Sequence, residues 1–128
     1  MTTTAQLRSH YARDSVTTAS PVRLVTMLYD RLARDIDDAE LAISMANPQR
    51  AHNALRHAQD IVQELTNSLD VESWSGGQGL QGLYAWLMEQ LVASNLTKDA
   101  SLLMGCREVV EPLREAWHEA SNTQMVAS

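Results

Sequence analysis

Residues 20–46 read SPVRLVTMLYDRLARDIDDAELAISMA, and this stretch decides the fold class. It begins with Ser20-Pro21, a helix-start signal in which a hydroxyl side chain caps the first turn and proline takes the first helical position. The apolar residues that follow recur at intervals of three and four, so they lie on one face of a helix. The pattern predicts a long amphipathic helix with the apolar stripe Leu24, Leu28, Leu32, Ile36, Ala39, Ile43 and Ala46.

The opposite face of this predicted helix is charged. Asp30 precedes Arg34 by four residues, and Arg31 precedes Asp35 by the same interval. Pairs at this spacing are neighbours on a helix surface, so we expect two weak, solvated ion pairs. The acidic group made by Asp35, Asp37, Asp38 and Glu40 is likewise expected to be solvated.

The same periodicity predicts three further helices. Asn47-Pro48 repeats the start signal, and a stripe of small and apolar residues follows it as far as Leu69. A Ser- and Gly-rich loop over residues 73–79 separates this helix from a third one, expected over about residues 80–96. Four such helices with short connections can hide their stripes by packing together, so the predicted fold is an all-α, antiparallel four-helix bundle.

The fourth helix is expected to start near Thr97 and to contain a proline. Pro112 removes one backbone hydrogen bond, but the apolar spacing continues in phase beyond it. The sequence therefore predicts a kink at this position rather than the end of the helix.

A single domain over residues 1–128 is expected, with ends that differ from the bundle at 20–121. Residues 1–19 carry few apolar anchors among weak helix formers, which predicts a marginal, detachable helical segment packed on the bundle. Residues 122–128 are expected to form a disordered tail.

Composition excludes several classes of protein. The net charge is −6 and the pI is about 5.0, which argues against nucleic-acid binding. The charge-free run at 73–88 is too short and too polar to span a membrane, and the N-terminus lacks the apolar core of a signal peptide. The single cysteine, Cys106, excludes an internal disulfide framework. A cytoplasmic protein without membrane insertion is expected.

The residues offer little catalytic chemistry. A di-iron bundle needs two Glu-x-x-His motifs, and the chain has one, Glu115 to His118. His52 and His57 are about 140° apart around a helix, so they do not converge on one ligand. Cys106 lies on an apolar stripe, where a small buried side chain is the ordinary outcome. No enzyme activity, metal, cofactor or small-molecule substrate is predicted.

Apolar surface is the remaining feature with a functional meaning. The stripes are wide, and the segment at 1–19 could cover one of them until an amphipathic partner helix takes its place. Trp74, in a polar loop, is either an anchor on the end of the bundle or a contact for a partner.

Short signatures in a fixed order narrow the identity of that partner. Taken together over residues 11–117, they resemble the FliS family of flagellar export chaperones. The signatures are Tyr11, Val16–Pro21, Leu24–Asp30, Ala58–Asp70, Gly76-Gly77, Leu83-Tyr84, Leu91–Asn95, Asp99 and Leu113–Trp117.

This resemblance implies a non-enzymatic chaperone in the bacterial cytosol. Its client would be the C-terminal region of flagellin, disordered before assembly, and its second partner the flagellar export-gate protein. Binding would prevent premature polymerisation and aid delivery to the type III export apparatus. The predicted flagellin-binding groove comprises Leu7, Tyr11, Val16, Met27, Arg31, Ala51, Ala54, Leu55, Ala58, Ile61, Tyr84 and Leu91.

The chain departs from the family pattern at three positions: Arg31 replaces a frequent glycine, Trp74 precedes the glycine pair, and Pro112 lies where the family usually has a helix without proline. Two other functions remain open on the residues alone. One is a structural homodimer in which the stripes bury each other, and the second is a metal-dependent bundle enzyme, which the ligand count argues against.

Overall fold

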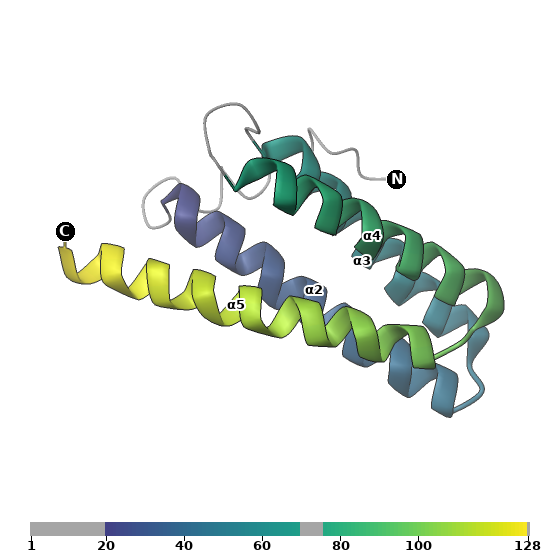
Figure 1. Cartoon of the computed structure of the whole chain (residues 1–128). Helices are drawn as coiled ribbons and strands as arrows, with labels where there is room; N and C mark the ends of the chain where they lie inside the picture. Colours follow the sequence, from purple (N-terminus) through teal and green to yellow (C-terminus); the bar gives the residue numbers. More distant parts are fainter. Residues whose placement is uncertain (1–19, 70–75, 128) are drawn as a thin grey trace.

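Four helices make up the part of the chain that the structure describes. The computed structural model describes residues 20–69 and 76–127, the last four of them by backbone only. The helices are α2 (Pro21–Ser44), α3 (Pro48–Ser68), α4 (Gly77–Thr97) and α5 (Ser101–Ala127), and no strand occurs within these ranges (Figure 1). The predicted all-α, four-helix fold is confirmed. The predicted N-terminal segment and Trp74 lie outside the described residues. Residues 77–79, predicted as part of a loop, instead form the first turn of α4.

The two predicted helix-start signals work as expected. The Ser20 hydroxyl accepts a hydrogen bond from the Arg23 backbone N–H at 3.2 Å, and the Asn47 side chain accepts one from the Arg50 N–H at 3.1 Å. Each cap is followed by proline at the first helical position, where a missing N–H costs nothing. Local sequence therefore determines where α2 and α3 begin.

Two further helix ends differ from the predictions. The predicted first stripe ran to Ala46, but α2 ends at Ser44 and Ala46 is exposed with a left-handed φ of 54°. The chain must reverse direction before Asn47 caps α3, and this turn takes Ala46 out of the stripe. Likewise, Thr97 ends α4 instead of starting α5, because Lys98 adopts a left-handed φ of 54°.

Helix α5 is longer than the apolar pattern indicated. It continues through Pro112, as predicted, and runs to Ala127, across most of the segment expected to be a tail. No glycine or second proline occurs after Pro112 to stop it, so the backbone hydrogen bonds can continue. The kink at Pro112 stays a prediction.

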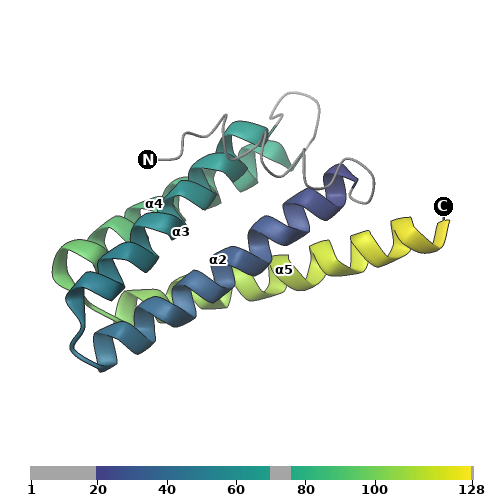
Figure 2. The same ribbon diagram turned by 180° about the vertical axis from the view of Figure 1, so that it is seen from behind.

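The helices pack in a ring, each against two neighbours. Helix α2 contacts α3 and α5, and α4 contacts the same two helices from the other side (Figures 1 and 2). Thr26 near the start of α2 bonds to Trp117 late in α5, whereas Asp37 further along α2 pairs with Arg107 early in α5. The later residue of α2 therefore contacts the earlier residue of α5, so these two helices run in opposite directions.

The core lies inside this ring and is built from the predicted stripes. Its fully buried large side chains come from all four helices and include Tyr29, Leu32, Leu55, Leu87 and Leu103. Cys106 is buried among them, as predicted.

Candidate functional site

Most of the predicted groove residues lie in the core. Leu7, Tyr11 and Val16 fall outside the described residues, and Met27 and Arg31 are half-buried. The other seven are at most 9% exposed and therefore contact neighbouring helices rather than solvent. Their part in binding stays a prediction. The seven are Ala51, Ala54, Leu55, Ala58, Ile61, Tyr84 and Leu91.

The accessible apolar surface is found chiefly on α4. This helix carries a single charged residue, Glu89, in its 21 positions. It buries Tyr84, Leu87 and Leu91, yet it also exposes Trp86 by 37% and Leu96 by 81%. A surface helix ordinarily has one apolar face and one polar face. An α4 that is apolar nearly all round presents apolar side chains to solvent as well as to the core.

On one side of α4, apolar side chains lie next to apolar side chains of α5. A Cβ built on Gly105 would lie 3.6 Å from Cη2 of Trp86, so the indole packs directly on α5. Met104, beside Gly105, is 61% exposed. We call the surface that these side chains form with their half-buried apolar neighbours the α4–α5 face. Leu83 and Trp86 form its α4 side, and Val109 and Leu113 form its α5 side. Met104 lies at its outer edge, about 140° from Val109 and 180° from Leu113 around α5.

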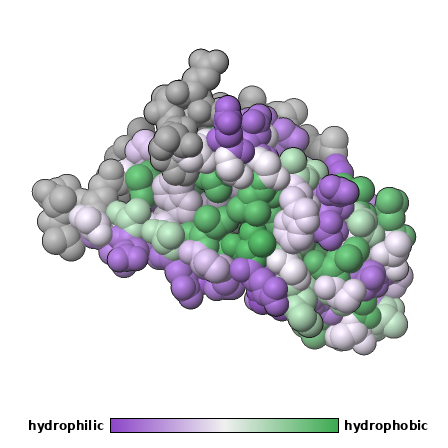
Figure 3. Space-filling view, viewed as in Figure 1, coloured by the Kyte–Doolittle hydropathy of each residue, from purple (hydrophilic) through white to green (hydrophobic). Residues whose placement is uncertain are grey.

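The space-filling view shows the extent of this surface. In Figure 3, apolar side chains gather over the middle of the molecule, in the region that α4 and α5 occupy in Figure 1, and polar side chains border them along the lower edge. Contiguous exposed apolar patches on soluble proteins mark sites of interaction.

The other exposed apolar side chains are placed differently. Val92 and Leu96 are about 120° and 80° from Trp86 around α4, toward the side on which Asn95 contacts His52 of α3. Leu41 and Met45 lie at the end of α2. The α4–α5 face is thus the place where exposed and half-buried apolar residues of two helices meet.

A buried hydrogen bond joins α4, which carries one side of this face, to α2. The hydroxyl groups of Tyr29 and Tyr84 are 2.6 Å apart, which joins α2 to α4 across the bundle. The Tyr29 ring also stacks on Trp117 of α5, with ring centroids 6.3 Å apart and planes 22° apart. Burial raises the pKa of both tyrosine hydroxyls, so they remain neutral hydrogen-bonding groups.

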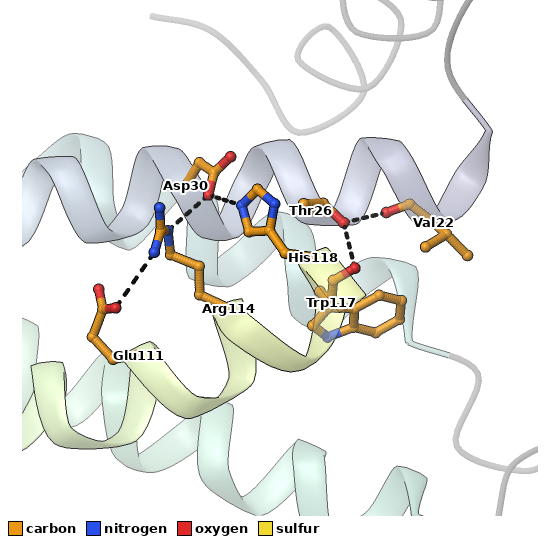
Figure 4. A network of polar contacts seen from close by, with 7 residues as sticks. All are labelled: Val22, Thr26, Asp30, Glu111, Arg114, Trp117 and His118. Atoms are coloured by element: carbon orange, nitrogen blue, oxygen red, sulfur yellow. Dashed lines mark hydrogen bonds and ion pairs between the residues drawn. The ribbon is translucent and has the colours of Figure 1, made fainter. Parts of the chain in front are cut away.

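A polar network joins α2 to α5 (Figure 4). Oδ1 of Asp30 accepts hydrogen bonds from Arg114 Nε at 2.8 Å and from His118 Nε2 at 2.6 Å. Arg114 also pairs with Glu111 at 3.4 Å, and Thr26 donates to the Trp117 carbonyl at 3.2 Å. The sequence spacing predicted that Asp30 pairs with Arg34 on its own helix, but its partners are on α5 because packing brings them closer.

Asp35 corrects another expectation. The sequence pattern predicts that it belongs to a solvated acidic face, but its side chain is only 3% exposed and contacts His57 of α3. The expected pair with Arg31 is present at 3.4 Å. Burial is the main influence on the Asp35 carboxyl and raises its pKa, against the lowering effects of His57 and Arg31. The sequence pattern missed this burial because it depends on where α3 packs.

The remaining candidate groups show no catalytic arrangement. His52 is exposed, and Glu115 is exposed while His118 is engaged with Asp30. Burial raises the pKa of the Cys106 thiol to about 11, which disfavours the reactive thiolate. Within residues 20–69 and 76–127, no group of three or more His, Cys, Asp or Glu could hold a metal ion. No helix in these ranges combines the length and apolarity that a bilayer crossing needs.

Comparisons with known proteins agree with one another. A family model described as flagellar protein FliS matches residues 3–124. A flagellar secretion chaperone FliS of Bacillus subtilis is 30% identical over 114 residues, covering 89% of this chain and 85% of the relative. The protein of that name from Campylobacter jejuni is 30% identical and covers 91% and 92%, respectively. The one from Escherichia coli is 32% identical and covers 83% and 79%.

Proposed function

The chain belongs to the FliS family of flagellar secretion chaperones, and from this premise we propose that it binds the disordered C-terminal region of flagellin in the bacterial cytosol. Binding prevents flagellin from polymerising before export. The complex is then delivered to the type III export apparatus, with the export-gate protein as second partner. The chain acts through binding alone and catalyses no reaction.

The α4–α5 face is the observation that supports this proposal. A disordered client loses conformational entropy when it is ordered on a surface, so the surface must offer a large apolar area in return. Trp86 and Met104 supply such area in exposed form, and the half-buried Leu83, Val109 and Leu113 extend it. An amphipathic segment that lies along two helices can bury the four side chains between α4 and α5, with Met104 at the edge of the contact.

The first experiment is a calorimetric titration of this protein with the C-terminal segment of flagellin from the same organism. We expect one-to-one binding with a negative heat-capacity change and a gain of helix by the segment, because apolar burial and ordering are coupled. Absence of binding, together with a mass that rises with concentration in sedimentation, would favour a structural homodimer instead.

A matched pair of variants tests the surface. Met104 and Met45 are each 61% exposed, but only Met104 lies on the α4–α5 face. Met104→Ala should weaken binding, whereas Met45→Ala should leave it unchanged. Equal affinities for the two variants would place the client elsewhere on the bundle.

A further inference from the structure

A row of glutamates continues the α4–α5 face along α5. Glu108, Glu115 and Glu119 are exposed and, with Glu111, are spaced three to four residues apart. At about 100° per residue these four lie within roughly 80° around the helix. Met104 precedes Glu108 by four residues and so starts the same line. The apolar face therefore has an acidic edge on the α5 side.

A shallow hollow lies beside this edge. Its volume is about 470 Å³, and the described residues that line it are Arg114, Glu115, His118, Glu119, Asn122 and Thr123.

The cationic side chains of the hollow are already engaged. Both Arg114 and His118 bond to Asp30, and Arg114 also pairs with Glu111. Glu115 and Glu119 form no ion pair within the described ranges. The hollow thus has an excess of negative charge, and it offers two carboxylates to a cation from outside.

We propose that the α4–α5 face selects a client segment with lysine or arginine side chains along one edge. This inference rests on the proposed chaperone function and names the chemistry of the client. The apolar side of the segment covers Trp86 and Met104, while its basic side chains lie over the glutamate row and one enters the hollow between Glu115 and Glu119. The rise along α5 places Glu108 about 6 Å and Glu115 about 16 Å from Met104, distances that a bound helix matches with residues at the same intervals.

Charge complementarity of this kind has a measurable signature. Exposed ion pairs are each weak, so removing two carboxylates should lower affinity by about three- to tenfold. The attraction is screened by salt, so the affinity of the unaltered protein should fall as ionic strength rises. Purely apolar binding would not weaken in this way.

The test compares two double variants that change net charge equally. Glu115→Gln with Glu119→Gln removes the acidic edge, and Asp38→Asn with Asp60→Asn removes two carboxylates from α2 and α3. The probe is the C-terminal flagellin segment, titrated at 50 and 300 mM salt. We expect the first variant to bind more weakly and with less salt dependence, and the second to bind like the unaltered protein.

Each outcome has one meaning. Equal affinity of the two variants, or unaltered-protein affinity that does not depend on salt, would overturn the charge proposal and leave the chaperone function standing. Failure of the unaltered protein to bind the segment at either salt concentration would overturn both. Circular dichroism of each variant checks that the bundle is folded.

Discussion

The hydroxyl groups of Tyr29 and Tyr84 meet 2.6 Å apart in the bundle core, although 55 positions separate the two residues in the chain. Both side chains are at most 2% exposed, so each hydroxyl has exchanged water for the other. The contact joins α2 to α4, which are not neighbours in the ring of helices. Tyr84 lies on the same turn of α4 as Leu83 and Trp86, which belong to the α4–α5 face.

Loss of one member of this pair should destabilise the fold. Tyr29→Phe or Tyr84→Phe leaves the remaining hydroxyl buried without its partner, at an expected cost of about 1–3 kcal/mol in the free energy of unfolding. The double variant should cost less than the sum of the two single variants, because no hydroxyl is then stranded. Urea denaturation of all four proteins measures this coupling, and additive costs would contradict it.

Glycine replacement in α4 should stabilise the protein. Gly82 lies inside the helix, and a Cβ built there meets nothing within 4 Å. Gly82→Ala should therefore raise the free energy of unfolding by about 0.5–1 kcal/mol, since alanine loses less backbone entropy on folding. Thermal denaturation measures the gain. A lower melting temperature would mean that the position is more crowded than the structure indicates.

The thiol of Cys106 should be protected in the folded protein. Burial raises its pKa from 9.0 to about 11, which reduces the thiolate fraction at pH 8 on the order of 100-fold. Iodoacetamide should consequently alkylate the native protein far more slowly than the urea-unfolded protein, as mass spectrometry over time can determine. Comparable rates in the two states would show that α5 opens readily.

Asp35 should make the stability depend on pH in a defined direction. Because its pKa is raised in the folded protein, the native state holds the proton more tightly than the unfolded chain does. The contribution of Asp35 to the free energy of unfolding is fully present below the ordinary carboxyl pKa of 3.8. It is lost as the pH rises through the pKa that Asp35 has in the folded protein. The groups that face Asp35 are His57, Arg31 and Asp38.

Asp35→Asn provides the comparison for this prediction. The free energy of unfolding of the unaltered protein, minus that of the variant, should grow as pH falls from 7 toward 4. Urea titrations at several pH values measure the difference, and a difference that shrinks on acidification would be the opposite of the expected result.

The candidate site was only partly readable from the sequence. The wide stripes indicated an abundance of apolar surface. Seven of the twelve residues predicted to form the groove are buried, Ala51, Ala54 and Ala58 of α3 among them, and their part in binding stays a prediction. A usable signal was present in α4, whose only charged residue is Glu89. The sequence does not show which apolar residues of α4 remain exposed, because this depends on the packing of Trp86 on Gly105 of α5.

Local pattern alone determined that this chain is all-α, that helices begin after Ser20 and Asn47, and that Cys106 is buried. These properties depend on the spacing of apolar residues and on the capping residues within a few turns of one helix. Both can be read from the order of residues in the sequence. Tertiary packing decided that Asp35 is buried, that Asp30 pairs with Arg114 rather than Arg34, and which apolar residues of α4 and α5 remain exposed. The burial, the ion pairing and the exposure of these residues depend on which helix covers a given face and on the register of the two helices. Contacts between residues far apart in the chain determine that arrangement.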